Sequence, residues 1–69
     1  MKYQERLRDL REDNDYSQQY IANQLKIAQT TYSQYELGQR SLPIECLINL
    51  CKIYGTSADY ILGLTETKN

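Results

Sequence analysis

The sequence predicts an all-α protein, a compact bundle of five short helices in a single domain of 69 residues. Apolar residues recur at spacings of three and four, as on the buried face of a helix. No stretch alternates β-branched and polar residues as a half-buried strand would. Three glycines each follow a periodic segment, where helices commonly end: Gly38, Gly55 and Gly63. We expect the core over about residues 3–64 and a polar tail at 65–69.

The first two helices are predicted by apolar stripes and a capping residue. The first should span about residues 3–13. Its stripe comprises Tyr3, Leu7 and Leu10. The second should follow Ser17, a residue typical of helix N-caps, and end near Lys26. Its apolar face comprises Ile21, Ala22 and Leu25.

The last two helices are predicted in the same way. Pro43 suits the first position of the fourth helix, which Gly55 should close. Its apolar positions are Leu47, Leu50, Cys51 and Tyr54. Ser57 should cap a short fifth helix over residues 58–62, ending before Gly63.

The third predicted helix, residues 29–37 (QTTYSQYEL), has an unusual polar face. That face carries uncharged amides and hydroxyls, Gln29, Thr30, Ser33 and Gln34, together with Leu37. Tyr32 and Tyr35 lie opposite and are expected in the core. Solvated helix faces are usually rich in charged residues. A glutamine amide can pair with the edge of adenine, and a threonine methyl can contact thymine. The pattern favours a surface that reads base edges over one that merely meets water.

Composition argues against several other functions. The chain has no histidine and no glycine-rich phosphate loop, so we expect no enzymatic activity and no cofactor. Cys46 and Cys51 are too far apart on a helix to form a disulfide, and two thiols alone do not make a zinc site. No apolar run approaches the roughly 18 residues of a membrane span. We expect a soluble cytoplasmic protein with no metal, no small-molecule ligand and no membrane association.

Residues 18–37, QQYIANQLKIAQTTYSQYEL, resemble the helix-turn-helix of the Xre family, the Cro- and phage-repressor-type regulators. The motif requires a small residue where the helices cross, here Ala22, with Gln18 at the start and ELG at 36–38. Its five apolar positions are filled by Ile21, Leu25, Ile27, Tyr32 and Tyr35. The resemblance extends over about residues 5–64. It implies a lambda-repressor-like fold in which helices two and three form the helix-turn-helix.

The resemblance also implies roles in binding double-stranded DNA. Helix three would enter the major groove, and its base-reading residues would be Gln29, Thr30, Ser33 and Gln34. The residues contacting the DNA backbone would be Ser17, Gln18, Lys26, Gln39, Arg40 and Ser41. Gln18 would also brace the first reading residue. Arg11 and Glu36 would form a structural ion pair between helices one and three.

Two positions depart from the family pattern. Lys26 occupies a turn position where the family usually has glycine, and a left-handed backbone there would cost lysine roughly 1–2 kcal/mol. Ala28 replaces the usual serine or threonine cap of helix three, and a missing cap costs about 1 kcal/mol. Both departures concern the geometry of the turn.

These observations together predict a transcriptional regulator, a repressor, acting at the bacterial nucleoid or in a phage-infected cell. A single reading helix contacts too few base pairs for useful specificity, so we expect a homodimer on a palindromic operator. Tyr60 and Leu64 are the expected dimer contacts. The alternative is a protein-interaction module that has lost DNA binding, which the acidic pI near 5.2 favours. Activation instead of repression is a second alternative.

Overall fold

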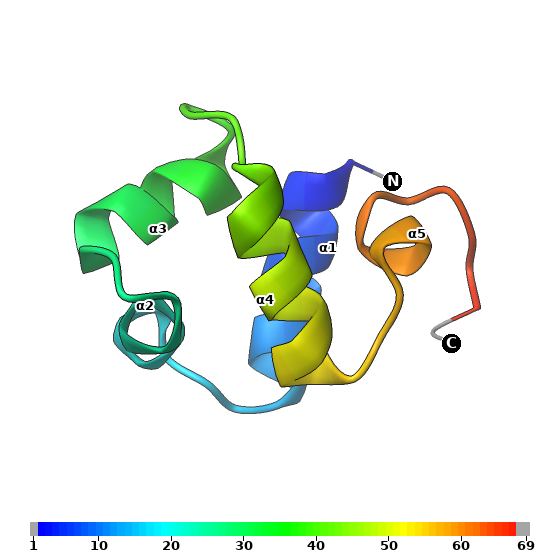
Figure 1. Ribbon diagram of the computed structural model, residues 1–69, viewed down its shortest axis with the longest axis horizontal. Coiled ribbons are helices and arrows are strands. Elements are labelled where there is room, and N and C mark those ends of the chain that lie inside the picture. Colours follow the sequence, from blue (N-terminus) through cyan, green and yellow to red (C-terminus); the bar gives the residue numbers. More distant parts are fainter. Residues whose placement is uncertain (1, 68–69) are drawn as a thin grey trace.

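Five helices follow one another in the computed structural model, which describes residues 2–67 (Figure 1). They are α1 (Tyr3–Asp13), α2 (Gln18–Leu25), α3 (Gln29–Leu37), α4 (Ile44–Tyr54) and α5 (Ala58–Ile61). No strand occurs in this part of the chain, so the predicted all-helical fold is confirmed. The last two residues of the predicted polar tail, 68 and 69, lie outside the described residues.

Side-chain caps fix the beginnings of α2 and α5. The Ser17 hydroxyl accepts a hydrogen bond from the backbone N–H of Tyr20 at 3.0 Å. The Ser57 hydroxyl accepts one from Tyr60 at 3.1 Å. Each bond satisfies a backbone donor that the first turn of a helix leaves without an intrahelical partner.

Two predicted boundaries are wrong by one residue. Pro43 is the N-cap of α4 and not its first helical residue, because its ψ of 149° is extended. The fifth helix ends at Ile61, and Leu62 forms its C-cap. In both cases the residue predicted to be helical is instead the cap residue next to the helix.

The core draws side chains from all five helices. Its buried apolar members are Leu7, Leu10, Ile21, Ala22, Leu25, Tyr32, Tyr35, Cys46, Leu50 and Ile61. The predicted core placement of Tyr32 and Tyr35 is therefore confirmed, and Tyr54 packs against this core half-buried. Both cysteines are free thiols.

The helices are arranged so that the two ends of the molecule differ (Figure 1). The α2–α3 unit occupies one end of the longest axis, and α5 lies at the other (Figure 1). The central α1 contacts both α3 and α5. This arrangement leaves one side of α3 at the surface.

Arg6 of α1 is an unexpected buried charge, with 3% of its surface exposed. Its guanidinium lies over the ring of Tyr60, 3.8 Å from the ring centroid. Its Nη2 also contacts a carboxylate oxygen of Glu66 at 3.3 Å. Arg6 therefore joins α1 to α5 and to the segment that follows it, a role that the sequence did not indicate.

Candidate nucleic-acid interface

The turn between α2 and α3 is built around a left-handed residue. Lys26 has φ 60° and ψ 42°, and its backbone N–H donates to the carbonyl of Asn23 at 3.2 Å. The N–H of Ile27 donates to the carbonyl of Ala22 at 3.0 Å. These bonds close α2 and redirect the chain. Ala28 then begins α3 with no side-chain capping bond.

The polar face of α3 is accessible, while its opposite side holds the helix in the core. Thr30 is exposed, and Gln29, Ser33 and Gln34 are half-buried. None of these four carries a charge. Tyr32 and Tyr35 anchor the helix from behind, both buried. The result is an uncharged hydrogen-bonding surface with a fixed position.

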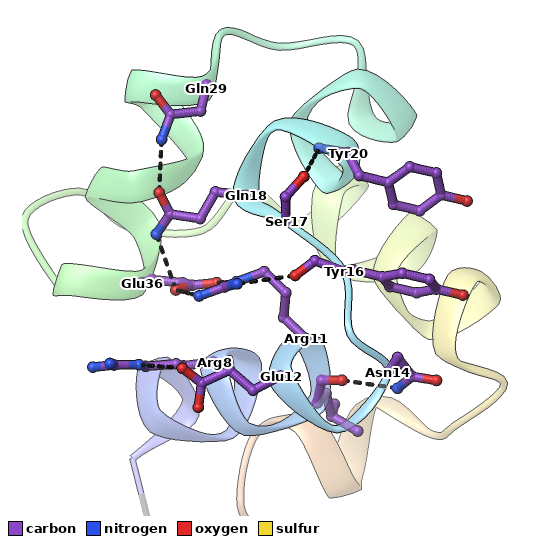
Figure 2. Close-up of polar contacts among 11 residues, drawn as sticks. Arg8, Arg11, Glu12, Asn14, Tyr16, Ser17, Gln18, Tyr20, Gln29 and Glu36 are labelled. Atoms are coloured by element: carbon purple, nitrogen blue, oxygen red, sulfur yellow. Dashed lines mark hydrogen bonds and ion pairs between the residues drawn. The ribbon is translucent and has the colours of Figure 1, made fainter.

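An ion pair joins α1 to α3 (Figure 2). The guanidinium of Arg11 donates to the two carboxylate oxygens of Glu36, from Nε at 2.7 Å and from Nη2 at 3.2 Å. Its Nη1 donates to the carbonyl of Tyr16 at 3.0 Å. Only 14% of the Arg11 side chain and 3% of the Glu36 side chain are exposed. The charges are therefore largely removed from water but satisfied by each other.

These surroundings change the acid–base properties of the buried groups. Burial by itself would raise the pKa of Glu36, but hydrogen bonds, from Arg11 above all, outweigh it, and the pKa lies below its ordinary value. Burial raises the pKa of the Tyr32 phenol, and the nearby Glu36 carboxylate raises it further. Burial likewise raises the pKa of Tyr54. At neutral pH the site therefore holds a charged carboxylate beside neutral phenols.

The ion pair also determines how two glutamine amides are oriented (Figure 2). Gln18 Nε2 donates to Glu36 at 3.2 Å, and Gln29 Nε2 donates to Gln18 Oε1 at 2.7 Å. An ionised carboxylate can only accept, so Gln18 must turn its NH₂ group toward Glu36. Its oxygen then faces Gln29, which must donate. Gln29 keeps its own carbonyl oxygen and its second N–H for another partner.

The six residues expected at the DNA backbone fall into three places. Ser17 and Gln18 lie at the start of α2, and Lys26 lies in the turn. Residues 39–41 form the loop after α3. All except the half-buried Gln18 are exposed. The turn precedes α3 and the loop follows it, while Gln18 contacts α3 through its bonds to Gln29 and Glu36.

Arg40, in that loop, makes a contact with α3 that the sequence did not indicate. Its Nε donates to Oε1 of Gln34 at 3.0 Å. The left-handed Gly38, at φ 76°, reverses the chain after α3. Glycine adopts this conformation without the steric cost that other residues incur. The one signal of this contact in the sequence is Gly38, which predicts a tight turn after the helix. It does not predict that Arg40 contacts Gln34.

The two expected dimer contacts differ in their surroundings. Tyr60 is half-buried beneath Arg6. Leu64 is 73% exposed. Both belong to the α5 end of the molecule, away from the α2–α3 unit.

Within residues 2–67, no three histidine, cysteine or acidic side chains gather where they could bind a metal ion. None of the helices described is both long and apolar enough to cross a membrane.

Comparison with known proteins identifies the family. The helix-turn-helix domain family matches residues 4–66. The uncharacterized HTH-type transcriptional regulator YobD of Bacillus subtilis is 38% identical over 93% of the chain and 57% of its own length. AnsR, an HTH-type transcriptional regulator of the same organism, is 39% identical over 93% of the chain and 55% of its length.

A phage relative shows the same pattern. The cryptic phage CTXphi transcriptional repressor RstR of Vibrio cholerae is 32% identical over 94% of the chain and 59% of its length. The chain thus spans somewhat more than half the length of these relatives. No solved structure matches it significantly.

These relatives carry the names of regulators and not of enzymes, which confirms the prediction of a non-enzymatic family. The match covers nearly all of the helices that the structure describes. The chain belongs to the helix-turn-helix family of Xre- and Cro-like transcriptional regulators.

Proposed function

We propose that the protein binds double-stranded DNA at a specific sequence, with α3 in the major groove, and represses transcription. The observation that carries this proposal is the uncharged polar face of α3, held in place by buried tyrosines. An α-helix fits the major groove, where each base pair presents a distinct pattern of donors and acceptors. The names of the relatives support a regulatory role, and RstR is named a repressor.

Gln29 is suited to adenine. Its amide nitrogen carries two hydrogens, one of which is donated to Gln18. The other hydrogen can be donated to N7 of adenine while the free carbonyl accepts from the N6 amino group. The bond to Gln18 therefore orients Gln29 without occupying the groups that adenine needs.

The other α3 residues and the flanking loops complete the interface. The hydroxyls of Thr30 and Ser33 can donate or accept, and the Thr30 methyl can contact thymine. Phosphates would be bound by residues on both sides of the helix: Ser17, Gln18, Lys26, Gln39, Arg40 and Ser41. Such contacts fix the register of the protein on the duplex and make binding depend on salt.

We further propose a homodimer on a palindromic operator, in the bacterial cytoplasm where the chromosome or phage DNA is. Reading helices of two copies, set about one helical turn of DNA apart, would double the number of base pairs contacted. The exposed Leu64 and the accessible part of Tyr60 are the proposed contacts between copies. Repression would follow from covering promoter sequence.

Selection from a pool of random duplex oligonucleotides tests the proposal. We expect an enriched half-site, repeated with inverted symmetry. Gln29→Ala should lose roughly 1–3 kcal/mol of binding on that site and relax the choice at one base pair. Asn49→Ala, which removes an exposed amide of α4, is the matched control and should change neither. If the wild-type protein enriches no sequence, the proposal is wrong, and the alternative of a protein-interaction module that has lost DNA binding replaces it.

A further inference from the structure

We infer that Arg40 sets the base preference of Gln34, so that the two side chains together favour a keto base, guanine or thymine, over an amino base. The inference rests on the proposed DNA-binding function and concerns one base pair within the site. It makes Arg40 a specificity-determining residue in addition to a contact for the DNA backbone.

The loop after α3 is folded so that Arg40 returns to that helix. Gly38 takes the left-handed conformation, and the backbone N–H of Gln39 donates to the carbonyl of Gln34 at 2.9 Å. This closed turn places the next residue beside the last turns of α3. Arg40 Nε then donates to Gln34 Oε1 at 3.0 Å.

The chemistry of the contact fixes the orientation of the Gln34 amide. A guanidinium has five N–H donors and no acceptor. The amide oxygen of Gln34 must therefore face Arg40, because the opposite orientation would set two donors against each other. The NH₂ group of Gln34 is left for another partner, and both side chains remain accessible at the surface.

The edge formed by these two side chains is rich in donors. Guanine presents two acceptors in the major groove, O6 and N7, and thymine presents O4. Cytosine presents the N4 amino group. Adenine presents N7 as one acceptor but also the N6 amino group, and in both bases the amino group would meet the N–H groups of Gln34 and Arg40. The Gln34 oxygen has a second lone pair that could accept from a base amino group. That amino group would also have to approach the Arg40 cation, which disfavours the contact.

Gln29 shows why the partner matters. It lies on the same helix and has the same side chain, but its neighbour is the oxygen of Gln18. The Gln18 oxygen accepts one N–H of Gln29 and leaves the carbonyl of Gln29 available. Two identical residues of α3 thus present different chemistry: Gln29 offers an acceptor and a donor, whereas Gln34 offers mainly donors.

The proposed effect of Arg40 on Gln34 is compatible with a contact between Arg40 and a DNA phosphate. Only Nε of Arg40 is used by Gln34, so both terminal NH₂ groups remain. Arg40 can bind a phosphate with these groups while its Nε holds the amide. Phosphate binding would in turn keep Arg40 beside Gln34 in the complex.

The test is selection from random duplex oligonucleotides with four proteins: wild type, Gln34→Ala, Arg40→Ala and Gln39→Ala. Gln34→Ala identifies the position read by Gln34, because base choice there should collapse. At this position we expect wild type to favour a keto base by roughly tenfold. Arg40→Ala should reduce that preference to about twofold or less, while the position read by Gln29 is unchanged. Gln39→Ala, a matched control from the same loop, should lower affinity with the same base choice.

Several results would overturn the inference while leaving the proposed function intact. One is an enriched half-site with adenine or cytosine at the Gln34 position. Another is an Arg40→Ala protein that binds more weakly but keeps the wild-type base distribution. A Gln34→Ala protein with unaltered choice at every position is a third. Failure of the proposed function itself is distinct, because wild type would then enrich no half-site at all.

Discussion

Arg11 and Glu36 lie 25 positions apart in the chain and are joined through two hydrogen bonds, the shorter 2.7 Å long. Removing one member leaves a largely buried charge without its main partner, which is strongly destabilising. We expect Arg11→Met to lower the free energy of unfolding by about 3 kcal/mol, measured by urea denaturation. The Arg8–Glu12 pair is the control, since its side chains are 65% and 52% exposed. Arg8→Met should cost less than about 0.5 kcal/mol. Equal losses in the two variants would contradict a stabilising role for the buried pair.

The same carboxylate predicts how stability depends on pH. The pKa of Glu36 is below its ordinary value of 4.5 in the folded protein, so the unfolded chain binds a proton first as pH falls. The stabilisation is fully present above about pH 4.5 and is lost as pH falls through the folded pKa. We expect the difference in unfolding free energy between wild type and Glu36→Gln to be constant near neutral pH and to shrink below that point. A difference that grows on acidification would refute the depressed pKa.

Lys26 predicts a gain in stability. Its left-handed backbone is strained for lysine, and glycine removes the strain but adds conformational entropy to the unfolded chain. We expect Lys26→Gly to raise stability by about 0.5–1 kcal/mol, seen as a higher melting temperature. Lys26→Ala keeps a Cβ atom and should give no gain. Asp15→Gly, at φ 57°, should gain less, because aspartate tolerates this conformation better. A neutral or destabilising Lys26→Gly would contradict the strain.

The bond between Gln18 and Gln29 predicts an effect on base choice. Gln18→Ala removes the group that orients the Gln29 amide while leaving Gln29 in place. On the selected DNA site, we expect it to weaken discrimination at the base pair that Gln29 is proposed to read by about 1 kcal/mol, the net worth of a typical hydrogen bond. Gln29→Ala should weaken it further. Competition binding with single base-pair variants measures both, and unchanged discrimination in Gln18→Ala would exclude an orienting role.

Arg6 and Tyr60 predict a coupled loss of stability. A cation partly removed from water over an aromatic ring contributes about 1–2 kcal/mol. Arg6→Met and Tyr60→Leu should each lose at least that much, and the double variant less than the sum, because both remove the same contact. Tyr60→Phe keeps the ring and should remain close to wild type. Additive losses in the double variant would show that the two residues act independently.

Much of the fold could be predicted because it depends on short-range pattern. Apolar spacing and capping residues placed all five helices with boundary errors of one residue, as at Pro43. Arg6 could not be predicted, since its partners lie 54 and 60 positions away and α5 must first dock on α1. The sequence alone treats it as one more charge on a polar helix.

The candidate site likewise contains one part that the sequence predicts and another that it does not. The polar face of α3 follows from helical periodicity within nine residues. The contact of Arg40 with Gln34 depends on the path of an irregular loop, which no periodicity describes. The resemblance to the family implied the proposed roles of the α3 residues, but for Arg40 it implied only a contact with the DNA backbone. The orientation of an amide is decided by its neighbours in space, and those neighbours are known only once the loop is placed.

The buried hydroxyls of Tyr32 and Tyr54 give the protein an optical reporter of its own fold. The chain contains seven tyrosines and no tryptophan or phenylalanine, so its near-ultraviolet absorbance comes chiefly from phenols. Because the pKa of each buried phenol is raised, deprotonation stabilises the unfolded chain relative to the folded one. Strong alkali should therefore open the structure, and the tyrosinate absorbance of these two rings should rise together with the loss of helical circular dichroism.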